Sequence, residues 1–173
     1  KMKKALKKYN CDLNLLVTDG CLFQCPFRYY HYNLTGHASQ SEHPLQGKYI
    51  DTCVINCSII KYSDPVELIK CRWIRPEDLV HYEEIGINKF KIAGRRMPTE
   101  WLVRAVDAYS NRKYKGNLID IIQAIAISVG ETYEKDPNIR MRDAIKIEKK
   151  PNVYIDNTKL DGFIDFFKNQ NCN

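Results

Sequence analysis

The sequence has no apolar stretch long enough to cross a lipid bilayer. Its longest apolar run, residues 121–129, is interrupted by Gln123 and Ser128 and falls far short of the roughly 20 residues that a membrane-spanning helix needs. No segment has the pattern of a secretory signal. These absences predict a cytoplasmic protein without a membrane partner.

Positive charge is scarce outside the first ten residues. The net charge is +6, and five of the positive charges belong to Lys1, Lys3, Lys4, Lys7 and Lys8. The rest of the chain is therefore nearly neutral, which argues against a basic body that attracts nucleic acid. Because apolar residues recur between these lysines near helical spacing, we expect the solvated face of a helix there, with a phosphate contact as the alternative.

Cysteine is also too sparse for a disulfide framework. The chain has seven cysteines among 173 residues, an odd number and a lower density than that of short secreted domains. Without a signal peptide, a reducing compartment is expected. Clustered cysteines in such a compartment are more often metal ligands or redox groups than bridges.

The order of predicted elements indicates an α/β fold. The composition, 44% apolar and 28% charged, is typical of a folded globular chain. The segments expected as strands are residues 12–18, 73–74 and 90–93. The segments expected as helices are residues 64–70, 75–85, 99–114 with Thr99 as the cap, 118–129 and 158–168, and residues 36–47 are expected to form an exposed loop. Alternating strands and helices predict parallel strands covered by helices.

Four cysteines form two pairs of identical spacing. Cys21 and Cys25 are one Cys-x3-Cys pair, and Cys53 and Cys57 are the other. On a helix this spacing places both sulfurs on one face, about one turn apart. Four thiolates suit either a structural zinc ion or a 4Fe–4S cluster. We favour the cluster because the wider spacing and Pro26, which follows the first pair, are more typical of iron–sulfur sites.

The remaining cysteines leave alternatives open. Cys71 has no partner at close spacing and is a reserve ligand, whereas Cys11 precedes a predicted strand and is expected to be structural. Some of the paired cysteines could instead be ordinary buried thiols, which are common in protein cores.

Four basic residues are candidates for binding an anionic substrate: Arg28, His31, Lys91 and Arg95. Lys91 and Arg95 lie in and just after a predicted parallel strand, and the carboxyl ends of such strands bind anionic ligands in α/β folds. The alternatives are a packing role for His31 and simple surface solvation for the others.

Several segments resemble the collagenase-like peptidase family U32. They are residues 20–28 (GCLFQCPFR), 31–33, 37–39, 74–79 (IRPEDL) and 86–95 (GINKFKIAGR), with weaker similarity at 155–157 and 160–163. The resemblance implies a TIM-type barrel with a 4Fe–4S cluster, held here by Cys21, Cys25, Cys53 and Cys57. Because a full barrel needs at least about 200 residues, we expect a partial barrel made of the later βα units in residues 1–130, followed by a C-terminal extension, residues 131–173, that ends in a helix.

The resemblance also implies candidate activities. Family members act as peptidases or are implicated in oxygen-independent hydroxylation of RNA or of a quinone precursor, so we expect an iron–sulfur modifying enzyme acting on an anionic substrate. A collagenase-like peptidase is the second expectation, although no serine–histidine–acid or zinc-protease motif is visible. A third is a non-catalytic half-barrel with a structural metal that completes a partner, such as a missing N-terminal half.

Overall fold

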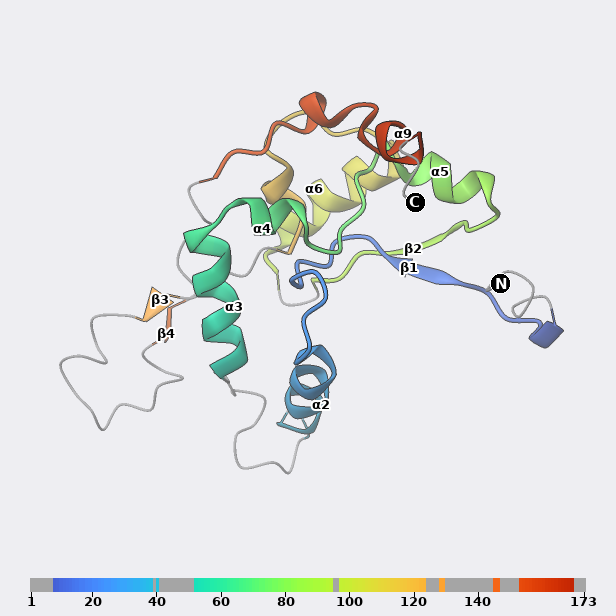
Figure 1. Ribbon diagram of the computed structural model, residues 1–173. Helices are drawn as coiled ribbons and strands as arrows, with labels where there is room; N and C mark the ends of the chain where they lie inside the picture. Colours follow the sequence, from blue (N-terminus) through green and yellow to red (C-terminus); the bar gives the residue numbers. More distant parts are fainter. Residues whose placement is uncertain are drawn as a thin grey trace. The chain divides into compact units, whose positions relative to one another are not determined.

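In the computed structural model, the chain falls into two compact units. Figure 1 labels the helices and strands of the chain. The structure describes residues 8–38, 40, 52–94, 97–123, 128–129, 145–146 and 153–169. The first unit, here called the strand unit, consists of Lys1–Asp19, Arg72–Gln123 and Tyr154–Asn173. The second, here called the cysteine unit, consists of Gly20–Cys71 and Ala124–Val153. Within the described ranges, no helix is long and apolar enough to cross a membrane.

The strand unit is built on two parallel strands. Strand β1 (Asn14–Leu16) pairs with β2 (Lys89–Lys91), with Leu15 opposite Phe90. Its helices are α5 (Leu79–Glu84), α6 (Thr99–Ser110), α9 (Phe163–Lys168) and the 3-10 turns η1 (Leu118–Asp120) and η2 (Asn157–Leu160). Strands form at both predicted places: β1 is shorter than the predicted 12–18, and β2 begins one residue before the predicted 90–93 and ends at Lys91. Their pairing is parallel. The described residues form a mixed α/β arrangement.

The cysteine unit is mainly helical. Its helices are α2 (Arg28–Ala38), α3 (Thr52–Ser63) and α4 (Val66–Ile69), and α3 contacts α4. Two short strands, β3 (Ser128–Val129) and β4 (Ile145–Lys146), pair in antiparallel fashion. Helix α4 lies within the helix predicted over residues 64–70, but it begins at Val66 with Pro65 rather than Asp64 in the cap position. The Asp64 carboxylate accepts a hydrogen bond from the Val66 amide at 3.0 Å.

The core of the strand unit lies around α6 and the segment that follows it. Its buried apolar side chains are Val17, Leu79, Trp101, Ala105, Ala108, Tyr109, Leu118, Ile119, Ile121, Ile122 and Ile155. The Tyr109 hydroxyl reaches two backbone carbonyl oxygens, those of Val17 at 3.0 Å and Ile74 at 2.8 Å. Burial raises the pKa of Tyr109 well above its ordinary value. One phenol thus joins α6 to the two chain segments beside β1.

Replacing Tyr109 with phenylalanine is expected to destabilise the fold by about 1–2 kcal/mol at neutral pH, because two buried carbonyl groups lose their shared donor. Above about pH 10 the unfolded chain loses the phenolic proton while the folded chain retains it, so stability falls as pH rises. The phenylalanine variant has no phenolic proton at this position and therefore lacks this pH-dependent part of the stability. Urea unfolding at pH 7 and pH 10.5 should therefore show a smaller difference between the two proteins at the higher pH, and an unchanged difference would contradict the assignment.

Gly94 turns the chain after β2 in a conformation that other residues avoid. Its φ is +125°, and a Cβ atom there would lie 2.7 Å from Cζ3 of Trp101. We expect Gly94→Ala to cost at least about 2 kcal/mol, because Trp101 is buried and cannot move aside freely. Gly162→Ala is the matched control in the same unit: its φ is also positive, at +77°, but nothing lies within 4 Å. Equal losses in thermal unfolding would show that the contact with Trp101 is unimportant.

The helix predicted over residues 118–129 is wrong. Of the residues that the structure describes in this stretch, Leu118–Asp120 form the single turn η1, and Ser128 and Val129 belong to β3. The Asn117 side chain accepts hydrogen bonds from the backbone amides of Ile119 at 3.3 Å and Ile155 at 2.9 Å. The backbone amide of Gln123 donates to the carbonyl oxygen of Thr18 at 3.0 Å. The bond between Asn117 and Ile119 is a local cap, whereas those that involve Ile155 and Thr18 are tertiary. Together they replace bonds that a continuous helix would make here.

Smaller corrections concern element boundaries. Residues 36–38 belong to α2 rather than to a loop, while residues 41–51 lie outside the described residues. Trp73 forms an isolated bridge with Thr18 instead of a strand. Pro98, not Thr99, occupies the cap of α6. The helix predicted over 158–168 is interrupted at Gly162, whose positive φ separates η2 from α9.

Candidate functional site

Helix α3 presents one of the cysteines together with a buried lysine. Cys57 and Lys61 are four residues apart, which places them on the same face of the helix. Lys61 is only 5% exposed, and its ammonium group donates a hydrogen bond to the carbonyl oxygen of Gly20. This face of α3 is therefore directed toward the backbone next to Cys21.

Cys71 meets the same backbone atom from the end of α4. Its thiol is buried and lies 3.3 Å from the Gly20 carbonyl oxygen and 3.1 Å from that of Glu67. The chain turns there through a hydrogen bond from the Cys71 amide to Leu68. Cys71, the predicted reserve ligand, thus lies beside the residue that precedes Cys21.

The first cysteine pair is in a turn and not on a helix. The Cys25 backbone amide donates a hydrogen bond to the Leu22 carbonyl oxygen at 3.4 Å, and Gln24 has a φ of +51°. The Cys21 thiol lies 3.2 Å from the Tyr32 hydroxyl on α2. The geometry assumed for this pair, two sulfurs on one helical face, is therefore wrong, whereas the second pair falls within α3.

The cysteine unit contains five of the seven cysteines of the chain. Cys21, Cys25, Cys53, Cys57 and Cys71 all belong to this one unit. Thiolates are the ligands of both zinc and iron–sulfur centres. The Cys53 side chain and Cys172 lie outside the described residues, and the described side chains alone bring no three metal-binding groups together. The four-cysteine ligand set stays a prediction.

The four basic candidates fall in different places. Arg28 begins α2 and stacks on Tyr29, with 5.1 Å between the guanidinium carbon and the ring centroid. His31 follows on the same helix, half-buried, with its ring 6.2 Å from that of Tyr32. Lys91 ends β2 with an exposed side chain in the strand unit, and Arg95 lies outside the described residues. The anionic site stays a prediction.

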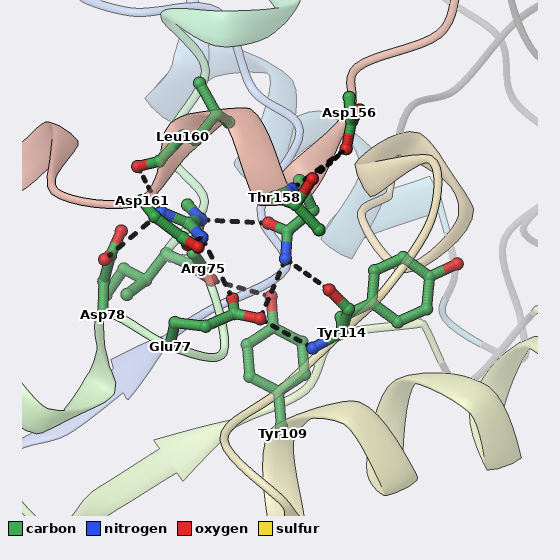
Figure 2. A network of polar contacts seen from close by, with 11 residues as sticks. Arg75, Glu77, Asp78, Tyr109, Tyr114, Asp156, Thr158, Leu160 and Asp161 are labelled. Carbon is green, nitrogen blue, oxygen red and sulfur yellow. Dashed lines mark hydrogen bonds and ion pairs between the residues drawn. The ribbon is translucent and has the colours of Figure 1, made fainter.

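A buried polar network in the strand unit was not anticipated (Figure 2). Arg75 is 1% exposed and donates to Asn157 at 2.9 Å, to the Leu160 carbonyl and to the Asp161 carboxylate. The Asn157 amide nitrogen in turn donates to Glu77 at 2.9 Å and to the Tyr114 carbonyl at 2.7 Å. The segment around η2 is thereby tied to the loop before α5.

Carboxylates surround the Arg75 guanidinium. Besides contacting Asp161, its nitrogen atoms lie 3.6 Å from a carboxylate oxygen of Glu77 and 3.7 Å from a carboxylate oxygen of Asp78. Burial raises the pKa of Asp78, and the positive charge of Arg75 opposes this shift. Arg75, its carboxylate partners and Asn157 come from the segments 74–79, 155–157 and 160–163, whose sequences carry the family resemblance. Their membership of these resembling segments was the only signal in the sequence that could have linked them.

The comparison with known proteins gives one informative relative. The chain is 33% identical over 164 residues to an uncharacterized protease of Methanocaldococcus jannaschii. The chain is a homologue of that protein. The aligned residues make up 95% of this chain but 41% of the relative, so the chain spans about two fifths of the relative's length. No family model matches the chain, and no solved structure matches it.

Proposed function

We propose that this chain is part of a collagenase-like protein of peptidase family U32 and that its cysteine unit holds a 4Fe–4S cluster. The observation that carries the proposal is the meeting of Lys61 and the Cys71 thiol at Gly20, one residue before Cys21. The homologue named as a protease supports the peptidase-type family, and the thiol chemistry supports the metal centre.

Cys21, Cys25, Cys53 and Cys57 would hold the cluster, with Cys71 as the replacement for one member of the second pair. A turn for the first pair and a helix for the second supply thiols from two separate chain segments. When bound, such a cluster supplies an electron-transfer or Lewis-acid centre. Zinc is the alternative occupant of a four-thiolate site.

The activity that we favour is an oxygen-independent modification, such as hydroxylation, of an anionic substrate of the RNA or quinone-precursor type. Arg28, His31, Lys91 and Arg95 would orient the anionic group by charge-assisted hydrogen bonds. Peptide hydrolysis is the second candidate, because the homologue bears the name of a protease. A purely structural metal in a half-barrel that completes a partner is the third.

The partial TIM-type barrel also belongs to this proposal. The parallel pairing of β1 with β2 and the helices between and after them are consistent with βα units. A barrel of this kind would need strands from another chain segment or a partner to close.

The test is purification of the chain without oxygen, followed by iron, sulfide and zinc analysis and a visible spectrum. We expect about four irons and an absorbance band near 400 nm, as for a 4Fe–4S protein. The same preparation is assayed for cleavage of gelatin. Stoichiometric zinc would favour the structural metal, and absence of both metals would overturn the metal centre, while gelatin cleavage would favour the peptidase.

A further inference from the structure

The Cys71 thiol lies beside the backbone of a second cysteine in the cysteine unit. Its sulfur is 3.3 Å from the carbonyl oxygen of Gly20, and Cys21 is the next residue of the chain. In a planar trans peptide that oxygen lies about 3 Å from the following Cα atom. The Cys71 sulfur is therefore at most about 6 Å from the Cα atom of Cys21. Turning the Cys21 side chain toward Cys71 leaves a gap that local adjustment can close to the S–S bond length of about 2.05 Å.

The Gly20 carbonyl group is held in place by a second donor. Lys61 of α3 is only 5% exposed, and its ammonium group donates to the same oxygen as the Cys71 thiol. Donors from two segments thus fix the backbone that leads into Cys21 next to the Cys71 sulfur. Lys61 contributes position rather than net charge here, because the buried Asp19 carboxylate lies one residue before Gly20 and has the opposite sign.

The two thiols differ in how easily a dissolved oxidant reaches them. Cys21 is half-buried, and its sulfur lies 3.2 Å from the Tyr32 hydroxyl on α2. Cys71 is only 7% exposed, and its sulfur lies 3.1 Å from the Glu67 carbonyl oxygen. Oxidation begins at the more accessible thiol, so Cys21 reacts first and the buried Cys71 is placed to resolve the product.

We propose that Cys21 and Cys71 form a reversible disulfide when the metal-free chain meets a low-molecular-weight disulfide such as glutathione disulfide. The Cys21 thiolate attacks one sulfur of the oxidant, whose S–S bond breaks and releases one glutathione thiolate. The Cys71 thiolate then attacks the Cys21 sulfur of this mixed disulfide, forms the Cys21–Cys71 bond and releases the second glutathione. The two protein thiols lose two protons and two electrons, which glutathione disulfide takes up as it becomes two thiols. The new bond separates Cys21 from Tyr32 and joins the turn before α2 to the end of α4.

The experiment treats the reduced full chain, freed of metal by a chelator, with glutathione disulfide; the remaining thiols are alkylated and linked peptides are identified by mass spectrometry. We expect the Cys21–Cys71 link in most of the oxidised protein, and we expect dithiothreitol to remove it. In Cys71→Ser, glutathione should persist on Cys21 at least about tenfold longer, because the resolving thiol is gone. Cys25→Ser and Cys57→Ser are matched controls: each removes a half-buried thiol of the same unit, and both should form the link like the unaltered chain.

A dominant link from Cys21 to any other cysteine would overturn the pairing, and so would glutathione that leaves Cys71→Ser as fast as it leaves the unaltered chain. Loss of the link in Cys25→Ser or Cys57→Ser, equal to that in Cys71→Ser, would overturn it as well. Thermal melting of the reduced variants shows which of them fold, and Cys71→Ala replaces Cys71→Ser if the latter does not. Because the chain carries no metal in this experiment, failure of the disulfide and failure of the metal centre are seen in separate measurements.

Discussion

Replacing Arg75 with methionine is expected to lower the free energy of unfolding by about 3–5 kcal/mol, the cost typical of breaking a buried ion-pair network from one side. The guanidinium group is almost fully buried and meets Asn157, Glu77, Asp78 and Asp161. Methionine fills much of the same volume but leaves these partners without their donor. Urea unfolding followed by tryptophan fluorescence measures the loss.

The control for Arg75 is an exposed ion pair in the same unit. Lys89 pairs with Asp12, and their side chains are 56% and 71% exposed. Lys89→Met should therefore cost less than about 1 kcal/mol. A loss in Arg75→Met no larger than that of Lys89→Met would contradict the structural role of the network.

A second variant tests the link to the segment around η2. Asn157 is fully buried and contacts Arg75, Glu77 and the Tyr114 backbone through both ends of its amide. Asn157→Leu should destabilise the chain by about 2–4 kcal/mol, because buried polar groups on two segments lose their partners. Limited proteolysis should then cut near residues 153–161 faster than in the unaltered chain.

Local sequence patterns predicted the helices and strands whose tertiary packing favours the same local structure. The strand predicted over residues 12–18 contains β1, and the strand predicted over residues 90–93 overlaps β2. Residues 118–129 failed because the apolar run gave no information about Asn117, whose side chain bonds to Ile155 far along the chain. A hydrogen bond between residues 38 positions apart leaves no periodic trace in the sequence.

The residues of the candidate sites also differ in whether the sequence alone could reveal them. Cysteine spacing pointed to the residues of the cysteine unit, since thiols are rare and their chemistry is specific. Arg75 was not recognised, because arginine is mostly exposed and nothing in its neighbours shows that it is buried. Lys61 was missed for the same reason: its burial depends on how α3 lies against Gly20, which the sequence alone does not reveal.

The cysteines should act as a unit when the protein holds its cluster. A 4Fe–4S cluster loses a corner when any one of its ligands is removed. Replacing Cys21 or Cys53 with alanine is therefore expected to remove most of the bound iron from protein purified without oxygen. The measurements are iron and sulfide content and the absorbance near 400 nm.

Cys11 and Cys71 provide the comparisons that make this result specific. The exposed Cys11 belongs to the strand unit, where its thiol donates to the Tyr9 carbonyl at 3.3 Å, so Cys11→Ala should keep its iron. Cys71→Ser retains a donor for the Gly20 and Glu67 carbonyls and thus tests ligation with little change in packing. Full iron retention in Cys53→Ala together with loss in Cys71→Ser would place the fourth ligand at Cys71. Full retention in Cys21→Ala would rule out the predicted ligand set, because every version of that set includes the thiol next to Gly20.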